Sequence, residues 1–250
     1  MIYPVMLCAF SSLSTGIGGC IVALFPRISQ RTMAVFQGFA AGVMVTVSVV
    51  EMLPRCFENM MDDMPPLYAA VYITLLLTAG WLAGIGISAA ADYIYKDKKE
   101  YTSAVRISLV TTAVMVLHNL PEGMLTVFSS MEDMRFGLEM AVAVALHNIP
   151  EGIVVASGVM YLTHSGAKAV ARSFFAGISE FIGGMAAVLV FGGMADGAFI
   201  GAVLAAVGGM MLQISVCELV PASVKLAGRL NAAAGFAAGA MIIYISLYAI

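Results

Sequence analysis

Long apolar runs alternate with short polar or proline-bearing segments along the sequence. Eight runs are each about long enough to cross the roughly 30 Å hydrocarbon core of a bilayer as a helix. They occupy residues 3–25, 33–53, 68–91, 104–128, 137–162, 170–192, 198–220 and 231–250. The strict apolar–polar alternation of a membrane β-strand is absent, and only helices or closed barrels span lipid. The pattern predicts an all-α membrane protein with eight transmembrane helices, forming one domain over residues 1–250.

The composition excludes several other classes of protein. Hydrophobic residues make up 61% of the chain and charged residues only 11%, whereas soluble domains carry about 25% charged residues. These values exclude intrinsic disorder and nucleic-acid binding, and the four cysteines show no CxxC spacing that would indicate a metal or redox motif. The first apolar run lacks a basic segment before it, so it is predicted to be a retained span and not a cleaved signal peptide.

The basic residues predict the orientation of the chain. Ten of the twelve Lys and Arg residues lie at one end of the predicted helices. They are Arg27, Arg31, Lys96, Lys98, Lys99, Arg106, Lys168, Arg172, Lys225 and Arg229, whereas Arg55 and Arg135 lie at the other end. Because cytoplasmic loops carry the excess of basic residues, the prediction is N-out and C-out.

Internal repeats relate the runs to one another. Residues 117–123 read LHNLPEG, and residues 146–152 read LHNIPEG. A second set, Gly42, Met44, Ser48, Glu51 and Pro54, recurs with identical spacing as Gly209, Met211, Ser215, Glu218 and Pro221. A fainter match pairs Ser14 and Ile17-Gly18-Gly19 with Ser179 and Ile182-Gly183-Gly184. Since the related helices run in opposite directions, the chain is predicted to form a 3+2+3 inverted repeat, as secondary transporters commonly do.

The first repeat places ionisable side chains near the middle of two adjacent helices, where they are costly and usually functional. These side chains and their neighbouring amides are His118, Asn119 and Glu122 on one helix and His147, Asn148 and Glu151 on the next. Imidazole and carboxylate together suit zinc, iron, cobalt, nickel or manganese. One copy alone is equally well explained as a structural His–Glu hydrogen bond, but two copies on antiparallel neighbours favour a metal site.

Four further side chains are candidates with open alternatives. Glu180 lies deep in the sixth helix, as a ligand or as a structural partner. Met44 is a candidate thioether ligand, although most methionines only fill core space. Glu51 and Glu218 lie near the predicted C-terminal ends of their helices, before prolines. The hypothesis is that they line the outer and inner mouths of one pathway, and the alternative is that they reach towards the membrane surface.

Further motifs accompany the central repeat: GFAAGVM and EMLP in the second helix, ISE followed by GG in the sixth, and GMM and ELVP in the seventh. With these motifs the chain resembles the ZIP (Zrt-, Irt-like) metal transporters over essentially its whole length, and in particular their bacterial ZupT-like branch. The resemblance implies a 3+2+3 arrangement with the fourth and fifth helices central. It also implies metal ligands at His118, Asn119, Glu122, His147, Asn148, Glu151 and Glu180, with Met44 as a further contact in some relatives.

Two features depart from the family pattern. The loop at residues 95–101 is short and lacks histidine, whereas many relatives carry a long, His-rich loop there. Phe181 stands where many relatives have a proline after the sixth-helix glutamate.

The sequence therefore predicts a multi-pass permease of the bacterial inner membrane that imports divalent metal. Zinc is the first candidate, and iron(II), manganese, cobalt and cadmium are the others. No cofactor beyond the transported metal and no nucleic-acid partner is expected, and no GxxxxGK[ST] motif indicates ATP. The pairs Gly183-Gly184 and Gly192-Gly193 would allow close helix contacts in a homodimer or within the chain. The alternative from another class is an intramembrane zinc-dependent hydrolase, although HExxH is absent.

Overall fold

The computed structural model describes residues 2–25, 28–61, 64–95, 103–191 and 197–249, and every regular element in these ranges is helical. The α-helices are α1 Ile2–Ala23, α2 Gln30–Thr46, α3 Leu53–Met61, α4 Pro66–Tyr95, α5 Ser103–Glu132, α6 Met134–Thr163, α7 Gly166–Ala186, α8 Gly197–Ile214 and α9 Val220–Ala249. Three π-helical turns, η1 Val47–Met52, η2 Ala187–Phe191 and η3 Ser215–Leu219, lie between or beside them.

Several of these helices and π-helical turns join end to end into longer apolar stretches. Six stretches of the described residues are long and apolar enough to cross a membrane. They are Ile2–Ala23, Gln30–Met61, Pro66–Ala90, Met134–Thr163, Gly166–Val190 and Gly197–Ser246. The last stretch bends sharply at Ala227 and Gly228, and Gly228 has a positive φ of 79° that glycine adopts without strain. The chain is thus an all-α membrane protein, as predicted.

Two helices continue past the points at which the sequence pattern ended them. The predicted helices ended at residues 53 and 220, directly before Pro54 and Pro221. In the structure the first of these helices continues to Met61 and the second to the bend at Ala227. Proline normally breaks a helix because it lacks an N–H. Here the preceding turn widens: Leu53 N–H donates to Ser48 O and Val220 N–H donates to Ser215 O, five residues back. The side chains in η1 and η3 therefore lie inside long helices and not near their ends.

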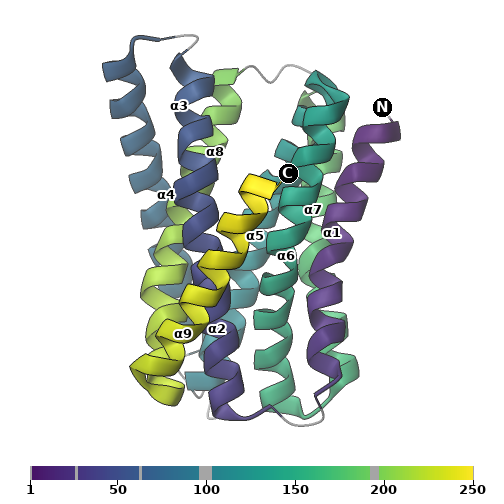
Figure 1. Ribbon diagram of the computed structural model, residues 1–250, viewed down its shortest axis with the longest axis vertical. Coiled ribbons are helices and arrows are strands. Elements are labelled where there is room, and N and C mark those ends of the chain that lie inside the picture. The colour runs from purple at the N-terminus through teal and green to yellow at the C-terminus, as the bar shows by residue number, and fades with distance from the viewer. Residues whose placement is uncertain (1, 26–27, 62–63, 96–102, 192–196, 250) are drawn as a thin grey trace.

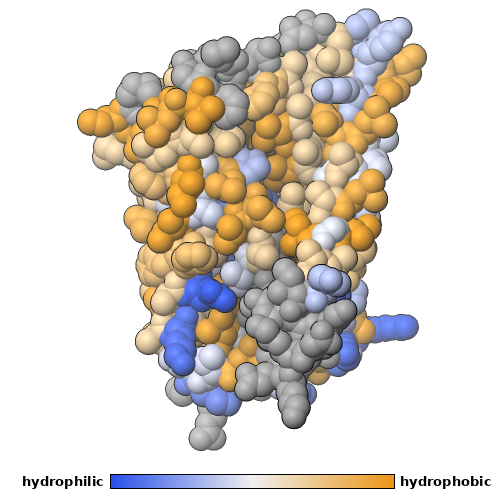
Figure 2. All heavy atoms as spheres, turned by 180° about the vertical axis from the view of Figure 1, so that it is seen from behind, coloured by the Kyte–Doolittle hydropathy of each residue, from blue (hydrophilic) through white to orange (hydrophobic). Residues whose placement is uncertain are grey.

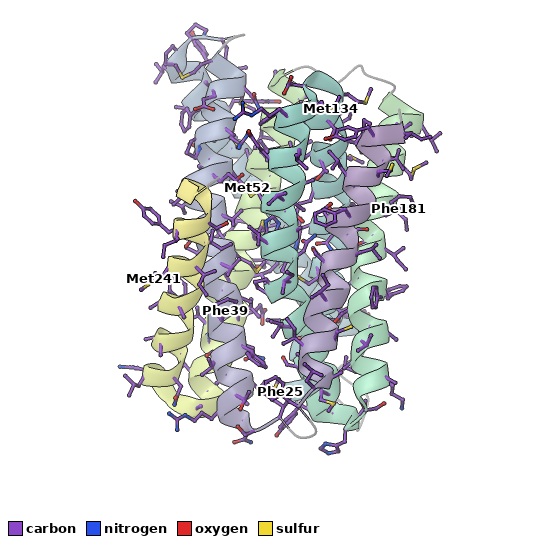
Figure 3. The ribbon with its side chains drawn as sticks, turned by 45° about the vertical axis from the view of Figure 1, so that its right-hand side comes forward. Phe25, Phe39, Met52, Met134, Phe181 and Met241 are labelled. Atoms are coloured by element: carbon purple, nitrogen blue, oxygen red, sulfur yellow. The ribbon has the colours of Figure 1, made fainter. Side chains whose placement is uncertain are left out.

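The helices pack as two sets (Figure 1). We call α1, α5, α6 and α7 the first bundle and α2, α4, α8 and α9 the second bundle, since the most extensive contacts fall within these sets. Figure 3 shows α9 and α2 side by side, with Met241 and Phe39 labelled on them. α3 extends the second bundle beside α8 and α4. Contacts of α6 with α2, and of α5 with α4 and α8, join the bundles.

Glycines allow the closest approaches in both bundles. A Cβ atom on Gly123 would collide with Glu180 O, and one on Gly152 would collide with Thr15 O. Gly183 and Gly184 also pack inside the chain, against α5 and α1, so this pair gives no support to a homodimer. The other glycine pair, Gly192-Gly193, lies outside the described residues. Small residues of this kind let helix backbones meet in membranes.

The outer surface is largely apolar, whereas part of the interior is polar. Figure 2 shows hydrophobic residues across the middle of one face and strongly hydrophilic residues gathered at its lower end. Large apolar side chains such as Met241 on α9 and Phe175 on α7 are more than half exposed, and Met241 points away from the bundle in Figure 3. Buried polar side chains, in contrast, gather within the first bundle. This inversion of the soluble pattern fits a protein whose outer surface meets lipid.

Candidate metal centre

α5 and α6 bring their two HNxPEG motifs to the same level of the first bundle. His118 Nε2 lies 3.0 Å from Glu151 Oε1, and His147 Nε2 lies 3.2 Å from Glu122 Oε1. Each histidine therefore contacts the glutamate of the other helix and not the one four residues along its own. The four side chains are almost fully buried, with at most 5% of any one exposed.

Three of these side chains already converge on one point. The ligating atoms of His118, Glu122 and Glu151 lie within 4.8 Å of one another. A zinc ion binds nitrogen and oxygen ligands at about 2.0–2.2 Å, so a single ion between them needs only small side-chain movements. His147 adjoins this group through its contact with Glu122. The cluster thus offers two nitrogens and two carboxylates to a divalent cation.

The cluster also contains buried polar atoms without hydrogen-bond partners. Such atoms are rare in folded proteins and call for an explanation. Among the described residues they include Oε2 of Glu122 and Glu151, Oδ1 of Asn119 and Asn148, and Nδ1 of both cluster histidines. Four of these atoms are oxygens that only accept, and oxygen acceptors together with imidazole nitrogens are what a divalent metal binds.

Backbone carbonyls of the flanking helices orient the two asparagines. Asn119 Nδ2 donates to Ala176 O of α7 at 3.2 Å, and Asn148 Nδ2 donates to Ser11 O of α1 at 3.0 Å. Each amide nitrogen is thereby held to the neighbouring helix. Each amide oxygen is left available as a ligand.

Glu180 of α7 is linked to the cluster through Asn148. Asn148 Nδ2 donates to Glu180 Oε2 at 2.6 Å, and the Ser11 hydroxyl donates to Glu180 Oε1. Glu180 is fully buried, and α7 remains helical through Phe181. The sequence analysis did not identify Ser11. The faint match of Ser14 with Ser179 makes Ser11 the repeat equivalent of Ala176, whose carbonyl oxygen holds the other asparagine, Asn119.

The remaining candidates lie on the second bundle. Met44 is fully buried in an apolar cluster to which α5 and α6 also contribute residues. Glu51 of η1 lines a pocket that reaches Glu122 and His147. Glu218 is partly buried in η3 and lies outside the lining of that pocket. The structure therefore connects one of the two proposed mouths to the cluster.

Comparison with known proteins gives a consistent result. The family model described as ZIP Zinc transporter matches residues 93–247. The zinc transporter ZupT of Chlorobium phaeovibrioides is 33% identical over 259 residues, which cover 98% of this chain and 97% of that protein. The zinc transporters ZupT of Salmonella heidelberg and Escherichia fergusonii are each 33% identical over 250 residues, covering 99% of this chain and 96% of those proteins.

Proposed function

The chain belongs to the ZIP family of zinc transporters, and from this premise we propose that it imports zinc through the cluster on α5 and α6. As a family member it is a divalent-metal transporter and not an enzyme, and it is an integral, multi-pass protein of the bacterial inner membrane. The observation that carries the proposal is the buried convergence of His118, Glu122 and Glu151. The hydrolase alternative finds no support in the comparisons.

The crosswise contacts give the cluster a way to hold and release its cargo. Without metal, one oxygen of each carboxylate pairs with an imidazole nitrogen of the other helix. A dehydrating ion replaces those contacts with bonds to nitrogen and oxygen, and its departure restores them. Because ligands must be deprotonated to bind, acid conditions should weaken metal binding. Zinc comes first among the cargo ions, and iron(II), manganese, cobalt and cadmium are tested as competitors.

The ligand set that we propose is larger than the three converging side chains. It adds His147, the amide oxygens of Asn119 and Asn148, and Glu180 as the partner at the edge of the site. Met44 is retained as a weaker candidate, because its thioether is fully buried on α2 and α2 contacts α6. Glu51 would line the outer mouth and Glu218 the inner one.

We also infer a 3+2+3 inverted repeat of eight spans. The six apolar stretches give this number when α5 is added and Gly197–Ser246 is divided at its bend. Contacts in equivalent places support the repeat: the bond from Asn119 to Ala176 O matches that from Asn148 to Ser11 O. Likewise Gly42 packs on Phe236 O as its repeat partner Gly209 packs on Leu77 O. Relative movement of the two bundles would then expose the cluster to each side in turn.

The distribution of charge supports N-out and C-out termini. Three basic residues of the described ranges lie near one end of the membrane-spanning helices. Arg31 is at the start of α2, Lys168 is at the start of α7, and Arg229 follows the bend in α9. On the face that Figure 2 shows, the most strongly hydrophilic residues gather at one end of the molecule. Arg55 and Arg135 lie towards the opposite end. By the positive-inside rule the first end faces the cytoplasm. Lys96, Lys98, Lys99 and Arg27 are outside the described residues.

The test is metal flux into proteoliposomes that contain the purified protein, with zinc, iron(II), manganese, cobalt and cadmium in competition. Wild type is compared with Glu122→Ala and Glu151→Ala. The matched control is Glu139→Ala, since Glu139 is a partly exposed α6 carboxylate paired with Arg135. Saturable zinc flux that both cluster variants lose and the control keeps is the expected result. Wild-type flux in either cluster variant would refute the proposed site.

A further inference from the structure

A pocket leads from η1 and α3 of the second bundle to the metal cluster. Apolar side chains form most of its wall, including Met52, which Figure 3 labels. Its polar lining consists of Glu51 and Arg55 at one end and Glu122 and His147 at the other. Among the described lining residues, a cation that uses this route passes one carboxylate, that of Glu51, before the cluster. It also passes a fixed positive charge, which the sequence alone gave no reason to expect.

Arg55 is held in the pocket by two contacts. Its Nη2 atom lies 3.6 Å from Glu51 Oε1, and its Cζ atom lies 5.1 Å from the centre of the Phe136 ring on α6. The Arg55 side chain is 30% exposed and that of Glu51 is 10% exposed, so both are partly removed from water. Under these conditions a guanidinium attracts the carboxylate and repels an approaching cation more strongly than in bulk solvent.

Other charged side chains near this end of the molecule are placed differently. Glu58 on α3 is exposed. Arg135 and Glu139 on α6 form an ion pair at 3.0 Å, with 87% of the first side chain and 41% of the second exposed. None of these three lines the pocket. Arg55 is therefore the cation that lies between the surface and the cluster among the described lining residues.

We propose that Arg55 is a tethered counter-ion of Glu51, which an entering divalent metal must displace. In the metal-free protein the guanidinium neutralises Glu51. A dication gains more from the carboxylate than a single positive charge does, so it can replace the guanidinium, whereas a monovalent ion has no such advantage. Arg55 thereby sets the apparent affinity for external metal and disfavours monovalent ions. This inference rests on the proposed role of Glu51 as the outer mouth.

The inference predicts that removing the charge improves apparent affinity. Arg55→Gln should lower KM for external zinc about two- to fivefold, the range expected for loss of one partly exposed ion pair. Arg55→Lys keeps the charge and should keep KM near the wild-type value. Arg55→Met keeps an apolar contact with Phe136 without the charge, and should lower KM as the glutamine variant does. It provides the second measurement if Arg55→Gln is poorly folded.

The experiment measures initial zinc flux into proteoliposomes against external zinc concentration. Arg135→Gln is the matched control, because it removes a basic residue from an ion pair at the same end of the molecule but outside the pocket. The expected result is a lower KM in Arg55→Gln and Arg55→Met, with Arg135→Gln unchanged. An unchanged or higher KM in both Arg55 variants, with Glu51→Gln raising KM, would overturn the role of Arg55 alone. An unchanged KM in Glu51→Gln would overturn the role of Glu51 and the inference with it.

Discussion

The two bundles pack in the same way but bury different chemistry. In both, glycines let helix backbones meet: Gly152 lies against Thr15 O in the first bundle, and Gly209 lies against Leu77 O in the second. The first bundle buries the imidazoles and carboxylates of the cluster together with Glu180. The fully buried polar side chains described in the second bundle are amides and hydroxyls, such as Gln37, Gln213 and Ser215.

This difference locates the function. A buried ionisable side chain inside a membrane protein is more expensive than a buried hydroxyl or amide, and it is usually kept where it performs a task. The second bundle instead supplies one side of the pocket that leads to the cluster, through Glu51, Met52 and Leu204. We therefore expect substitutions in the first bundle to change metal binding, and comparable substitutions in the second bundle to change stability or access.

The largest effect is expected for the cluster histidines. His118→Ala and His147→Ala should each weaken zinc binding by about a hundredfold or more, because loss of even a supporting side chain at a metal site costs about 10- to 100-fold. The measurement is zinc binding to the purified protein in detergent. The control is His164→Asn, since His164 is exposed at the end of α6 and has a left-handed conformation that Asn tolerates. Wild-type affinity in either cluster variant would contradict the shared crosswise site.

The next comparison adds one methyl group at equivalent helix crossings. Gly123→Ala and Gly152→Ala in the first bundle, and Gly42→Ala and Gly209→Ala in the second, all place a Cβ against a carbonyl oxygen. Each should lower the free energy of unfolding by about 1–3 kcal/mol, the usual cost of overpacking. Only the first pair should also weaken zinc binding, because those crossings position α5 and α6.

Thermal unfolding in detergent and zinc binding, measured on the same samples, separate the two effects. Gly86→Ala is the control, since a Cβ at Gly86 would meet no atom within 4 Å. If zinc binding were weakened in the second-bundle variants as well, metal binding would not depend on the first bundle alone, and the proposed difference between the bundles would be contradicted.

A third comparison uses a fully buried position at which the two flanking helices differ in charge. The repeat places Thr15 of α1 level with Glu180 of α7, and both are fully buried. Glu180→Gln should weaken zinc binding about tenfold, at the lower limit for a supporting group at a metal site, because Glu180 fixes Asn148. Thr15→Val should leave binding unchanged, since the Thr15 hydroxyl has no hydrogen-bond partner among the described residues. Equal effects of the two substitutions would contradict a special role for Glu180.

The sequence alone was enough to predict the helical membrane class, and the HNxPEG motifs made their six polar side chains candidate ligands. Both depend on local spacing: an apolar run long enough for the bilayer, and a histidine and glutamate on one helix face. The crosswise pairing of His118 with Glu151 could not be predicted, because it depends on how α5 and α6 are shifted along each other. Ser11 and Arg55 were missed for the same reason, since each acquires its role only from a contact with a neighbouring helix or turn.

The predictions that two helices end before Pro54 and Pro221 were wrong for a different physical reason. Proline usually marks the end of a helix, because it has no N–H to donate to the preceding turn. A π-helical turn before the proline allows the helix to continue past it. Nothing in the hydrophobic pattern distinguishes such a turn from an ordinary helix end. The equivalent serines, Ser48 and Ser215, are the local feature that accompanies both turns.

These serines give the smallest expected effect, and it tests whether the two π-helical turns of the second bundle are equivalent. Ser48 Oγ donates to Met44 O at 2.8 Å, and Ser215 Oγ donates to Met211 O at 2.8 Å. Ser48→Ala and Ser215→Ala should each lower the free energy of unfolding by about 0.5–1.5 kcal/mol, the net value of one hydrogen bond. Zinc binding should stay unchanged in both, as the serines lie outside the first bundle. Thermal unfolding with and without zinc measures the two quantities, and Thr74→Ala on exposed α4 provides the control, because its hydroxyl also donates to a carbonyl four residues back. A large loss in one serine variant alone would show that the turns are not equivalent and would weaken the inverted repeat.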